Sequence, residues 1–287
     1  MPAVRLFQFP RFPATLEKYK QHKGAAAVTQ QGKSPAQAKS RAKPPAKPII
    51  GITLDWALSS TFSKRPHYAL RTHYFEAIEA AGGIPLGIPY ADSCIDTYLN
   101  LIDGLIVPGG GMAKPQDWYL DPAATQPYQP MPRLAFDMAL IEAALRHGLP
   151  VLGICEGMQV LAGMHGCTLT HNVQQTFHTT TDHLNARPAE ERAHAVTIKP
   201  GTLLEKILHT TTLEVNTAHT EGVAKVPPQV TVSATAPDGV IEAIEIPGYP
   251  FALGVQWHPE FFMNPTDPDR NIFTALLAAA HAAQSPQ

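Results

Sequence analysis

The chain has 287 residues, 44% of them hydrophobic, which suffices for one large domain or two small ones. Its formal net charge is −2, and no apolar run approaches the ~20 residues that a membrane-spanning helix needs. We expect no membrane association and no nucleic-acid partner.

Residues 1–47 differ in charge from the rest of the chain. They carry ten basic residues and one acidic residue, whereas residues 48–287 carry 12 basic and 23 acidic residues. From residue 23 onward the segment is rich in Ala, Gln, Lys, Pro and Ser, and it has too few large apolar side chains to offset the entropy of ordering. We therefore predict a disordered basic extension at 1–47 and a folded domain at 48–287.

Two other roles for this extension stay open. Its basic residues suit a targeting peptide, although Pro2, Pro10 and Pro13 interrupt any helix there, so a solvated tail is the preferred interpretation. Residues 4–9 instead suit a short docking strand, and the tail is a candidate segment for binding a partner.

The three cysteines, Cys94, Cys155 and Cys167, favour a reducing compartment. Their number is odd, and the N-terminal segment lacks the apolar stretch of a secretory signal. We therefore expect a cytoplasmic protein in which Cys155 stays a free thiol, with Cys94 and Cys167 as structural thiols.

Strand and helix signals alternate in the first half of the domain. They predict strands at 48–54, 84–88, 104–107 and 149–152, and helices at 68–81, 134–146 and from 160 onward. Such alternation implies an α/β fold with a mostly parallel sheet and helices on both faces.

The pattern changes after Gly166. Short strands are predicted at 195–198, 230–234, 240–246 and 251–255, followed by a closing helix at 269–283. We expect a small antiparallel β portion in this C-terminal half.

Cys155 stands between a predicted buried strand and a helix, in the sequence Gly153-Ile154-Cys155-Glu156-Gly157-Met158-Gln159. The free N–H groups and the dipole at a helix N-terminus favour a thiolate. Gly153 and Gly157 leave room for a strained turn and for a substrate. A lone buried cysteine is more often inert, but this arrangement is typical of a nucleophile on a sharp turn.

A nucleophilic thiol needs a base and a group that orients the base. His258 and Glu260 follow a predicted strand and are two residues apart, so in extended backbone they point to the same side. Pro259 restrains the backbone between them. Gly109, Gly110 and Gly111 follow another buried strand, where backbone N–H groups can face an oxyanion.

Taken together and in this order, the three motifs resemble the class I (triad) glutamine amidotransferase superfamily. The similarity covers roughly residues 48–284 and is greatest to the free-standing peptidase C26 branch, the gamma-glutamyl-gamma-aminobutyrate hydrolase-like proteins. Further matching segments are Gly51-Ile52-Thr53, Ala81-Gly82-Gly83-Ile84-Pro85, Val215-Asn216 and Asp238-Gly239-Val240-Ile241-Glu242-Ala243.

The resemblance implies a flavodoxin-like fold and a role for each matching residue. Cys155 would form a gamma-glutamyl thioester, His258 would relay the proton and Glu260 would orient His258. The remaining residues implied at the site are backbone oxyanion donors at Glu156, Gly109 and Gly110, and substrate contacts at Gln159, Asn216 and His219. For Gln159 an ordinary helix-surface amide is the alternative.

Several positions depart from the pattern of this branch. Glu156 stands where the branch usually has arginine, and a carboxylate there opposes thiolate formation unless it is paired or points away. The glycine loop continues with Met112-Ala113-Lys114-Pro115 instead of the usual Asp-Val and proline, which suggests a remodelled pocket. The proline-rich segment 115–132 is one of two things. It is an insertion that covers the site, which would be similar to the hydrolase branch, or it is a rigid surface loop.

We expect no metal and no cofactor. His178, Asp182 and His183 lie close together in sequence, but their spacing matches no strong ligand pattern and the implied chemistry needs no metal.

The leading hypothesis is therefore a cysteine-dependent hydrolase of small gamma-glutamyl amides. The alternatives are a glutaminase subunit that delivers ammonia to a separate synthetase, and a catalytically silent binding protein on the same fold. Homodimer formation also stays open.

Overall fold

The structure is a computed structural model that describes residues 47–121, 132–184 and 187–284. The predicted extension therefore lies, apart from Lys47, outside the described residues. So does most of the proline-rich segment after residue 121.

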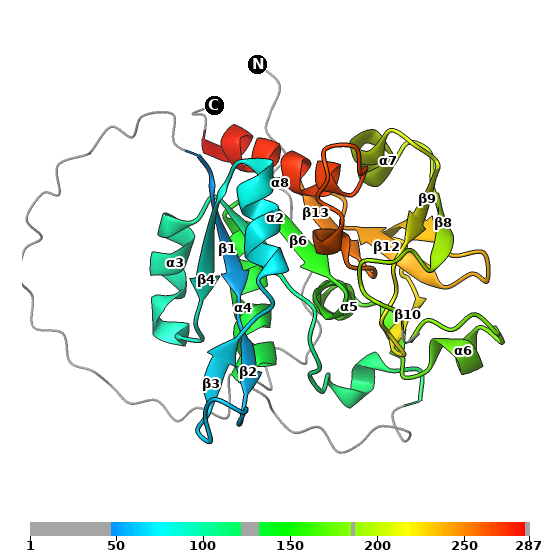
Figure 1. The fold of residues 1–287 in the computed structure, drawn as a ribbon, viewed down its shortest axis with the longest axis horizontal. Helices are drawn as coiled ribbons and strands as arrows, with labels where there is room; N and C mark the ends of the chain where they lie inside the picture. The colour runs from blue at the N-terminus through cyan, green and yellow to red at the C-terminus, as the bar shows by residue number, and fades with distance from the viewer. Residues whose placement is uncertain (1–46, 122–131, 185–186, 285–287) are drawn as a thin grey trace, which may run out of the picture. The chain divides into compact units, whose positions relative to one another are not determined.

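Eleven strands of the described residues form one sheet, in the order β4-β1-β5-β6-β13-β12-β11-β8-β9 (Figure 1). Strands β4, β1, β5, β6 and β13 run parallel, and from β13 onward the pairing is antiparallel. The remaining strands, β10 and β7, branch from β12. Their bounds are β1 Ile49–Thr53, β4 Ile84–Ile88, β5 Gly104–Val107, β6 Val151–Ile154, β7 Thr168–Thr170, β8 His194–Ile198, β9 Thr212–Val215, β10 Gly222–Lys225, β11 Thr231–Thr235, β12 Ile241–Glu245 and β13 Ala252–Val255.

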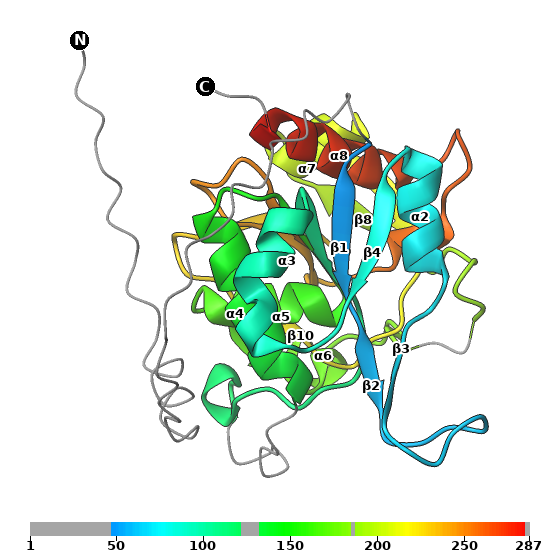
Figure 2. The ribbon, with the colours of Figure 1, turned by 90° about the vertical axis from the view of Figure 1, so that its left-hand side faces the viewer.

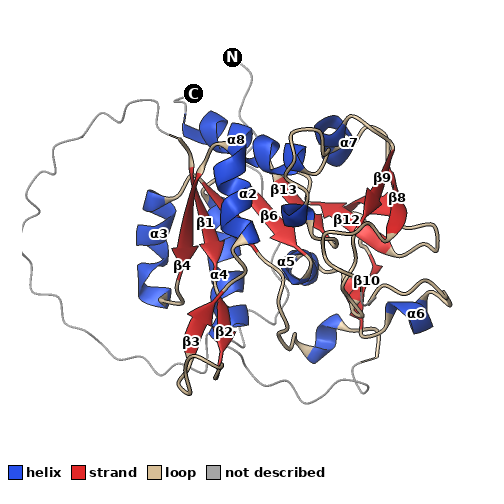
Figure 3. Cartoon of the chain, viewed as in Figure 1, coloured by secondary structure: helices blue, strands red, loops and turns tan. Residues whose placement is uncertain are grey.

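Helices cover both faces of the parallel strands (Figure 2). On one face α2 packs against α8 and α8 against α7, and on the other α4 lies between α3 and α5. Their bounds are α2 His73–Ala81, α3 Ile95–Leu101, α4 Pro132–Arg146, α5 Glu156–Met164, α6 Val173–Thr176, α7 Leu203–Leu208 and α8 Arg270–Gln284. The predicted α/β class is confirmed, with its parallel sheet and its antiparallel C-terminal portion (Figure 3).

The apolar core explains why these elements assemble. Ile50 and Ile52 of β1 are fully buried in one cluster with Ile78 of α2 and with Ile272 and Phe273 of α8. The alternating strand and helix patterns thus bury their apolar faces against one another, as the hydrophobic effect requires.

The predicted helix at 68–81 is wrong in its first turn. Tyr68 lies instead in β3 (His67–Ala69), which pairs with β2 (Asp55–Ala57) in a separate two-stranded sheet. The ring of Tyr68 packs edge-on against Trp56 at 5.2 Å and against Tyr90 at 5.0 Å between centroids. These aromatic contacts outweigh the local helical spacing.

Among the helices of the described residues, none combines the length and the apolar character needed to cross a membrane.

Candidate active site around Cys155

Cys155 occupies the sharp turn between β6 and α5. Its backbone has φ 53° and ψ −107°, a conformation that a residue with a side chain rarely adopts. The Cys155 N–H donates to the carbonyl oxygen of Val255 at 2.7 Å, which ties the turn to the end of β13. The thiol thus stands at a helix N-terminus, where unpaired N–H groups favour negative charge.

Gly153 and Gly157 make this turn sterically feasible. A Cβ at Gly157 would lie 1.9 Å from the carbonyl oxygen of Val107, and one at Gly153 would lie 2.6 Å from the backbone of Gly157. Both contacts are with main chain, which cannot rotate away as a side chain can. The glycines of the motif therefore allow α5 to approach β5 and β6 closely.

His258 and Glu260 lie beside this turn. They follow β13, and Glu260 belongs to a short 3-10 helix, η4 (Pro259–Phe261). His258 Nδ1–H donates to Glu260 Oε1 at 2.7 Å, and both side chains are buried. Glu260 therefore holds one imidazole nitrogen and leaves Nε2 free to face another group.

Charge around His258 favours its protonated form. Burial alone lowers the pKa of His258, but the opposite charges of Glu260 and of a Cys155 thiolate, with hydrogen bonds to both, raise it to about 10. The imidazole and the Cys155 side chain both lie next to Gly109, since a Cβ built on that residue would be within 3.4 Å of each.

Asn216 holds the backbone of His258. Its side-chain oxygen accepts from the His258 N–H at 2.9 Å, and its amide donates to the His258 carbonyl at 3.1 Å. The same amide also donates to the Ala189 carbonyl at 2.6 Å. Asn216 thus occupies its hydrogen-bonding groups in fixing the base, and its predicted contact with substrate stays a prediction.

The glycine loop after β5 faces the same centre. A Cβ on Gly109 would lie 2.9 Å from the His258 ring and 3.4 Å from Cys155 Cβ. The Gly109 N–H donates to the hydroxyl of Tyr74 at 3.1 Å, and that hydroxyl lies 3.5 Å from His258 Nδ1. Burial, followed by the charges of Glu260 and Cys155, raises the pKa of Tyr74 well above its usual value, so the hydroxyl stays protonated.

Arg133 of α4 orients this loop from behind. Its guanidinium donates to the carbonyls of Pro108 at 2.6 Å and Gly109 at 3.1 Å. Because the N–H and C=O of a trans peptide point in opposite directions, the N–H groups of Gly109 and Gly110 face away from Arg133. The role of these N–H groups as oxyanion donors stays a prediction.

Glu156 is paired and does not act as a free charge beside the thiol. Its Oε1 accepts from Lys114 Nζ at 3.0 Å and from the Met112 N–H at 2.6 Å. Lys114 is buried and also donates to Glu221 Oε2 at 2.9 Å. Burial lowers the pKa of Lys114, but the charges of Glu156 and Glu221 outweigh it and raise the pKa above its usual value. The departures at Glu156 and Lys114 therefore compensate each other.

Gln159, one helical turn after Cys155, is buried. Its amide donates to Gln256 Oε1 at 3.1 Å and to the Glu221 carbonyl at 3.0 Å, so it is no ordinary helix-surface amide. Gln256 in turn donates to Cys155 Sγ at 3.6 Å. The predicted substrate contact of Gln159 is not tested by this arrangement.

His219 belongs to a different cluster. Its Nδ1–H donates to the Glu221 carbonyl at 3.0 Å, and its Nε2 lies 3.5 Å from Glu242 Oε1. Its predicted contact with substrate stays a prediction. In the described part of the chain, one group with the spacing of metal ligands is found, and it consists of His183, His194 and Glu242.

A cavity of about 480 Å³ opens beside the glycine loop. Gly109, Gly110, Tyr74 and His258 belong to its lining, which also includes Asp55, Ala69, Leu70, Arg71 and Gly111. It is large enough to hold a small molecule against the reactive groups.

Four side chains at this centre are not predicted from the sequence, namely Tyr74, Lys114, Arg133 and Gln256. The helical spacing marks Tyr74 only as a core position, and Arg133 precedes the predicted start of its helix. Gln256 offers the clearest signal, because it stands two residues before His258 and thus on the same side of an extended chain.

The chain is similar to several known proteins. A glutamine amidotransferase-like protein of Rickettsia prowazekii is 33% identical over 276 residues, covering 82% of this chain and 98% of its own length. The gamma-glutamyl-gamma-aminobutyrate hydrolase of Escherichia coli K12 is 30% identical over 240 residues, covering 81% and 93%.

Solved structures show the same fold at lower identity. A GMP synthase component of Thermoplasma acidophilum aligns with a TM-score of 0.54 at 17% identity, over 82% of this chain and 95% of that one. The glutaminase domain of Trypanosoma brucei CTPS, with bound acivicin, aligns with a TM-score of 0.53 at 17% identity, over 84% and 96%. The profile of the Peptidase C26 family matches residues 48–260, and the chain therefore belongs to that family.

Proposed function

We propose that the chain hydrolyses gamma-glutamyl amides through Cys155, His258 and Glu260. The observation that carries the proposal is the strained Cys155 turn beside a buried His258–Glu260 pair, with a glycine loop and a cavity facing both. The Escherichia coli relative, by its name, hydrolyses such an amide.

In the first half of the reaction the Cys155 sulfur attacks the gamma-carbonyl carbon. The carbon–nitrogen bond breaks, and protonated His258 gives its Nε2 proton to the leaving amine. A thioester then links the gamma-glutamyl group to Cys155. Glu260 keeps the ring oriented and stabilises its charged form, as the carboxylate of other triads does.

Water completes the reaction. His258, now neutral, takes a proton from water, whose oxygen attacks the thioester carbon, and the carbon–sulfur bond breaks to release glutamate and restore the sulfur. In both halves the carbonyl oxygen becomes negative. Backbone N–H groups of Glu156 and of the Gly109–Gly110 loop would stabilise it. Gly109 would exchange its bond to Tyr74 for one to this oxygen.

The amine portion of the substrate would occupy the cavity whose lining includes Asp55 and Arg71. One carboxylate and one guanidinium at its lining suit an amine portion that itself carries charge. Gln159 and Gln256 would then lie on the glutamyl side, next to the sulfur.

The test uses mass spectrometry to measure the release of glutamate from a panel of gamma-glutamyl amides. We expect Cys155→Ala to lose all turnover and Cys94→Ala, at a cysteine away from the site, to keep it. Labelling by a glutamine-analogue electrophile should map to Cys155. Turnover that survives in Cys155→Ala would disprove the mechanism, and an unlabelled, inactive wild-type protein would favour a silent binding protein.

A further inference from the structure

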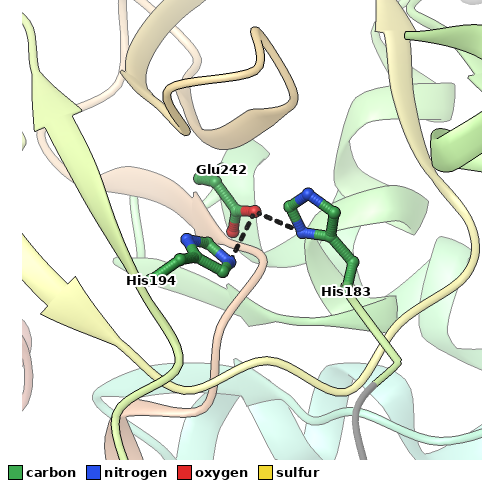
Figure 4. Close-up of side chains that lie close together, drawn as sticks. All are labelled: His183, His194 and Glu242. Carbon is green, nitrogen blue, oxygen red and sulfur yellow. Dashed lines mark ion pairs between the residues drawn. The ribbon is translucent and has the colours of Figure 1, made fainter. Parts of the chain in front are cut away.

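Three buried side chains and one partly buried side chain, His194, converge on one point in the antiparallel half of the sheet, away from the Cys155 turn. His183 comes from the loop before β8, His194 from the start of β8, His219 from the loop after β9, and Glu242 from β12. Figure 4 shows His183 and His194 directed at the carboxylate of Glu242 from two sides. Segments far apart in sequence thus bring together three imidazoles and one carboxylate.

The distances suit a metal ion better than hydrogen bonds. Glu242 Oε1 lies 3.4 Å from His183 Nδ1, 3.6 Å from His194 Nε2 and 3.5 Å from His219 Nε2. Zinc bonds of 2.0–2.2 Å place neighbouring ligand atoms of a tetrahedron about 3.3–3.6 Å apart. The ligand atoms of His183, His194 and Glu242 all lie within 4.8 Å of one another. His219 joins these three through its 3.5 Å approach to Glu242.

The outer nitrogen of each imidazole already has a partner. His183 Nε2–H donates to Asp238 at 3.0 Å, His219 Nδ1–H to the Glu221 carbonyl at 3.0 Å, and His194 Nδ1–H to the Ala195 carbonyl at 3.1 Å. Such outer bonds fix the tautomer in which the other nitrogen carries a lone pair, as is usual for metal-bound histidines.

The inner atoms lack such partners. His183 Nδ1, His194 Nε2, His219 Nε2 and both oxygens of Glu242 are buried without a hydrogen bond in the described structure. No Lys or Arg of the described residues forms an ion pair with Glu242. Three lone pairs and a carboxylate that face one another repel unless a cation lies between them, and buried polar atoms without partners are rare in native proteins.

Protons alone are a poor substitute for a metal. Protonating all three rings would place positive charges on histidines whose centroids lie 4.8 Å and 5.0 Å apart, around a single carboxylate. Like charges at this separation disfavour one another inside a protein. One divalent ion satisfies all four inner groups at once.

We propose that His183, His194, His219 and Glu242 bind one divalent transition-metal ion of the Zn²⁺ type in a tetrahedral site. Three nitrogens and one oxygen are a donor set that zinc accepts, and four protein ligands leave no open position for a substrate. The ion is therefore structural. This site departs from the expectation, drawn from sequence spacing alone, that the chain binds no metal.

The position of His219 gives the ion a consequence for the rest of the fold. His219 lies three residues after Asn216, which holds the His258 backbone, and two residues before Glu221, which pairs with Lys114. A metal that binds His219 would restrain the segment between Asn216 and Glu221. The binding proposal itself is independent of the reaction at Cys155.

The test measures metal binding by the full chain carrying Cys155→Ala, which removes the reactive thiol as a competing ligand. The protein is stripped with a chelator and titrated with Zn²⁺, and bound metal is counted by mass spectrometry after gel filtration. We expect one equivalent of Zn²⁺ and a raised melting temperature. Co²⁺ in its place should give the visible absorption of a tetrahedral site.

Variants locate the site. Glu242→Gln and His183→Ala should each weaken Zn²⁺ binding by more than ~100-fold, and Asp238→Ala, which removes the outer partner of His183, by about 10- to 100-fold. His281→Ala, at an exposed histidine of α8, should bind as the parent does. Circular dichroism checks that each variant is folded.

Two results would overturn the proposal. One is a folded parent protein that takes up no stoichiometric Zn²⁺ or Co²⁺, a measurement that needs no further variant. The other is a folded Glu242→Gln or His183→Ala protein that retains the parent's affinity, since the metal would then bind elsewhere.

Discussion

At the residue scale, the acidic residue next to the thiol, Glu156, is paired with a buried lysine. Glu156 follows Cys155 directly, and its charge would oppose a thiolate if it were free. Lys114 reaches it from the loop after β5, and the Met112 N–H adds a second bond. Two departures from the usual pattern of the branch, Glu156 and Lys114, therefore form an ion pair with each other.

Lys114→Met should expose this pairing. It leaves Glu156 as a buried carboxylate without its cation, which we expect to cost about 3 kcal/mol of unfolding free energy. It should also lower kcat/KM, because the charge opposes the Cys155 thiolate. Urea denaturation and glutamate release measure the two effects.

The double variant Lys114→Met/Glu156→Gln is the control. With no charge left at Glu156, it should regain part of the stability and of kcat/KM lost in the single variant. Equal losses in the single and double variants would mean that the two side chains act independently.

The charge state of His258 is a second residue-scale matter. In the folded protein its pKa is raised to about 10 from the usual 6.5, since the charges of Glu260 and Cys155 outweigh burial. Because protonation of His258 is more favourable in the folded state, it contributes to the free energy of unfolding. This contribution is fully present below about pH 6.5 and is lost as the pH rises through about 10.

Glu260→Gln should therefore lower the pKa of His258. NMR titration of the His258 ring, assigned with His258→Asn, should find it protonated at about pH 8 in the wild type and at a lower fraction in the variant. The stability lost between about pH 6.5 and 10 should also be smaller in Glu260→Gln. An unchanged pKa of His258 in the variant would mean that Glu260 does not stabilise the protonated imidazole.

At the element scale, the approach of α5 to the sheet depends on Gly157. Its Cα hydrogen faces the Val107 carbonyl on β5, where a methyl group would overlap the oxygen. The nucleophile turn, the helix start and the strand spacing are thus coupled through one contact.

Gly157→Ala tests this coupling. We expect it to cost about 3 kcal/mol or more, because β5 and α5 must move apart. Gly111→Ala is the matched control, since a Cβ there meets nothing within 4 Å, and its stability should stay within ~0.5 kcal/mol of wild type. Denaturant unfolding compares them. Equal stability of the two variants would contradict this packing.

At the scale of the whole molecule, the described residues between 47 and 284 enclose an apolar core. The strands are covered on both faces by helices of the same unit. The basic extension at 1–47, its partner, the oligomeric state and the cytoplasmic location all stay predictions.

Deleting residues 1–46 should leave the melting temperature and the turnover of gamma-glutamyl amides unchanged, because the buried apolar faces pair within the remaining chain. Calorimetry and the glutamate assay check this, and gel filtration of both forms reports whether either is a dimer. A drop in melting temperature of several degrees would show that the extension packs on the domain.

Much of the fold follows from local sequence patterns. The strands predicted at 84–88 and 104–107 coincide with β4 and β5, and the thiol motif lies on the predicted strand-to-helix turn. These features depend on backbone periodicity, on glycine and on apolar runs, all of which act over a few residues. The helix predicted at 68–81 is wrong where aromatic contacts between separate segments outweigh the local pattern.

The sequence by itself determined the α/β class and the order of the thiol, histidine and glycine motifs, because each is encoded within a short stretch. Only the tertiary structure decided that Lys114 pairs with Glu156, that Tyr74 meets Gly109, and that three histidines surround Glu242. Each of these contacts joins separate elements of the chain and depends on strand order, which no local pattern contains. Long-range charge pairing and ligand clustering are properties of the packed sheet, and they appear once the strands are in place.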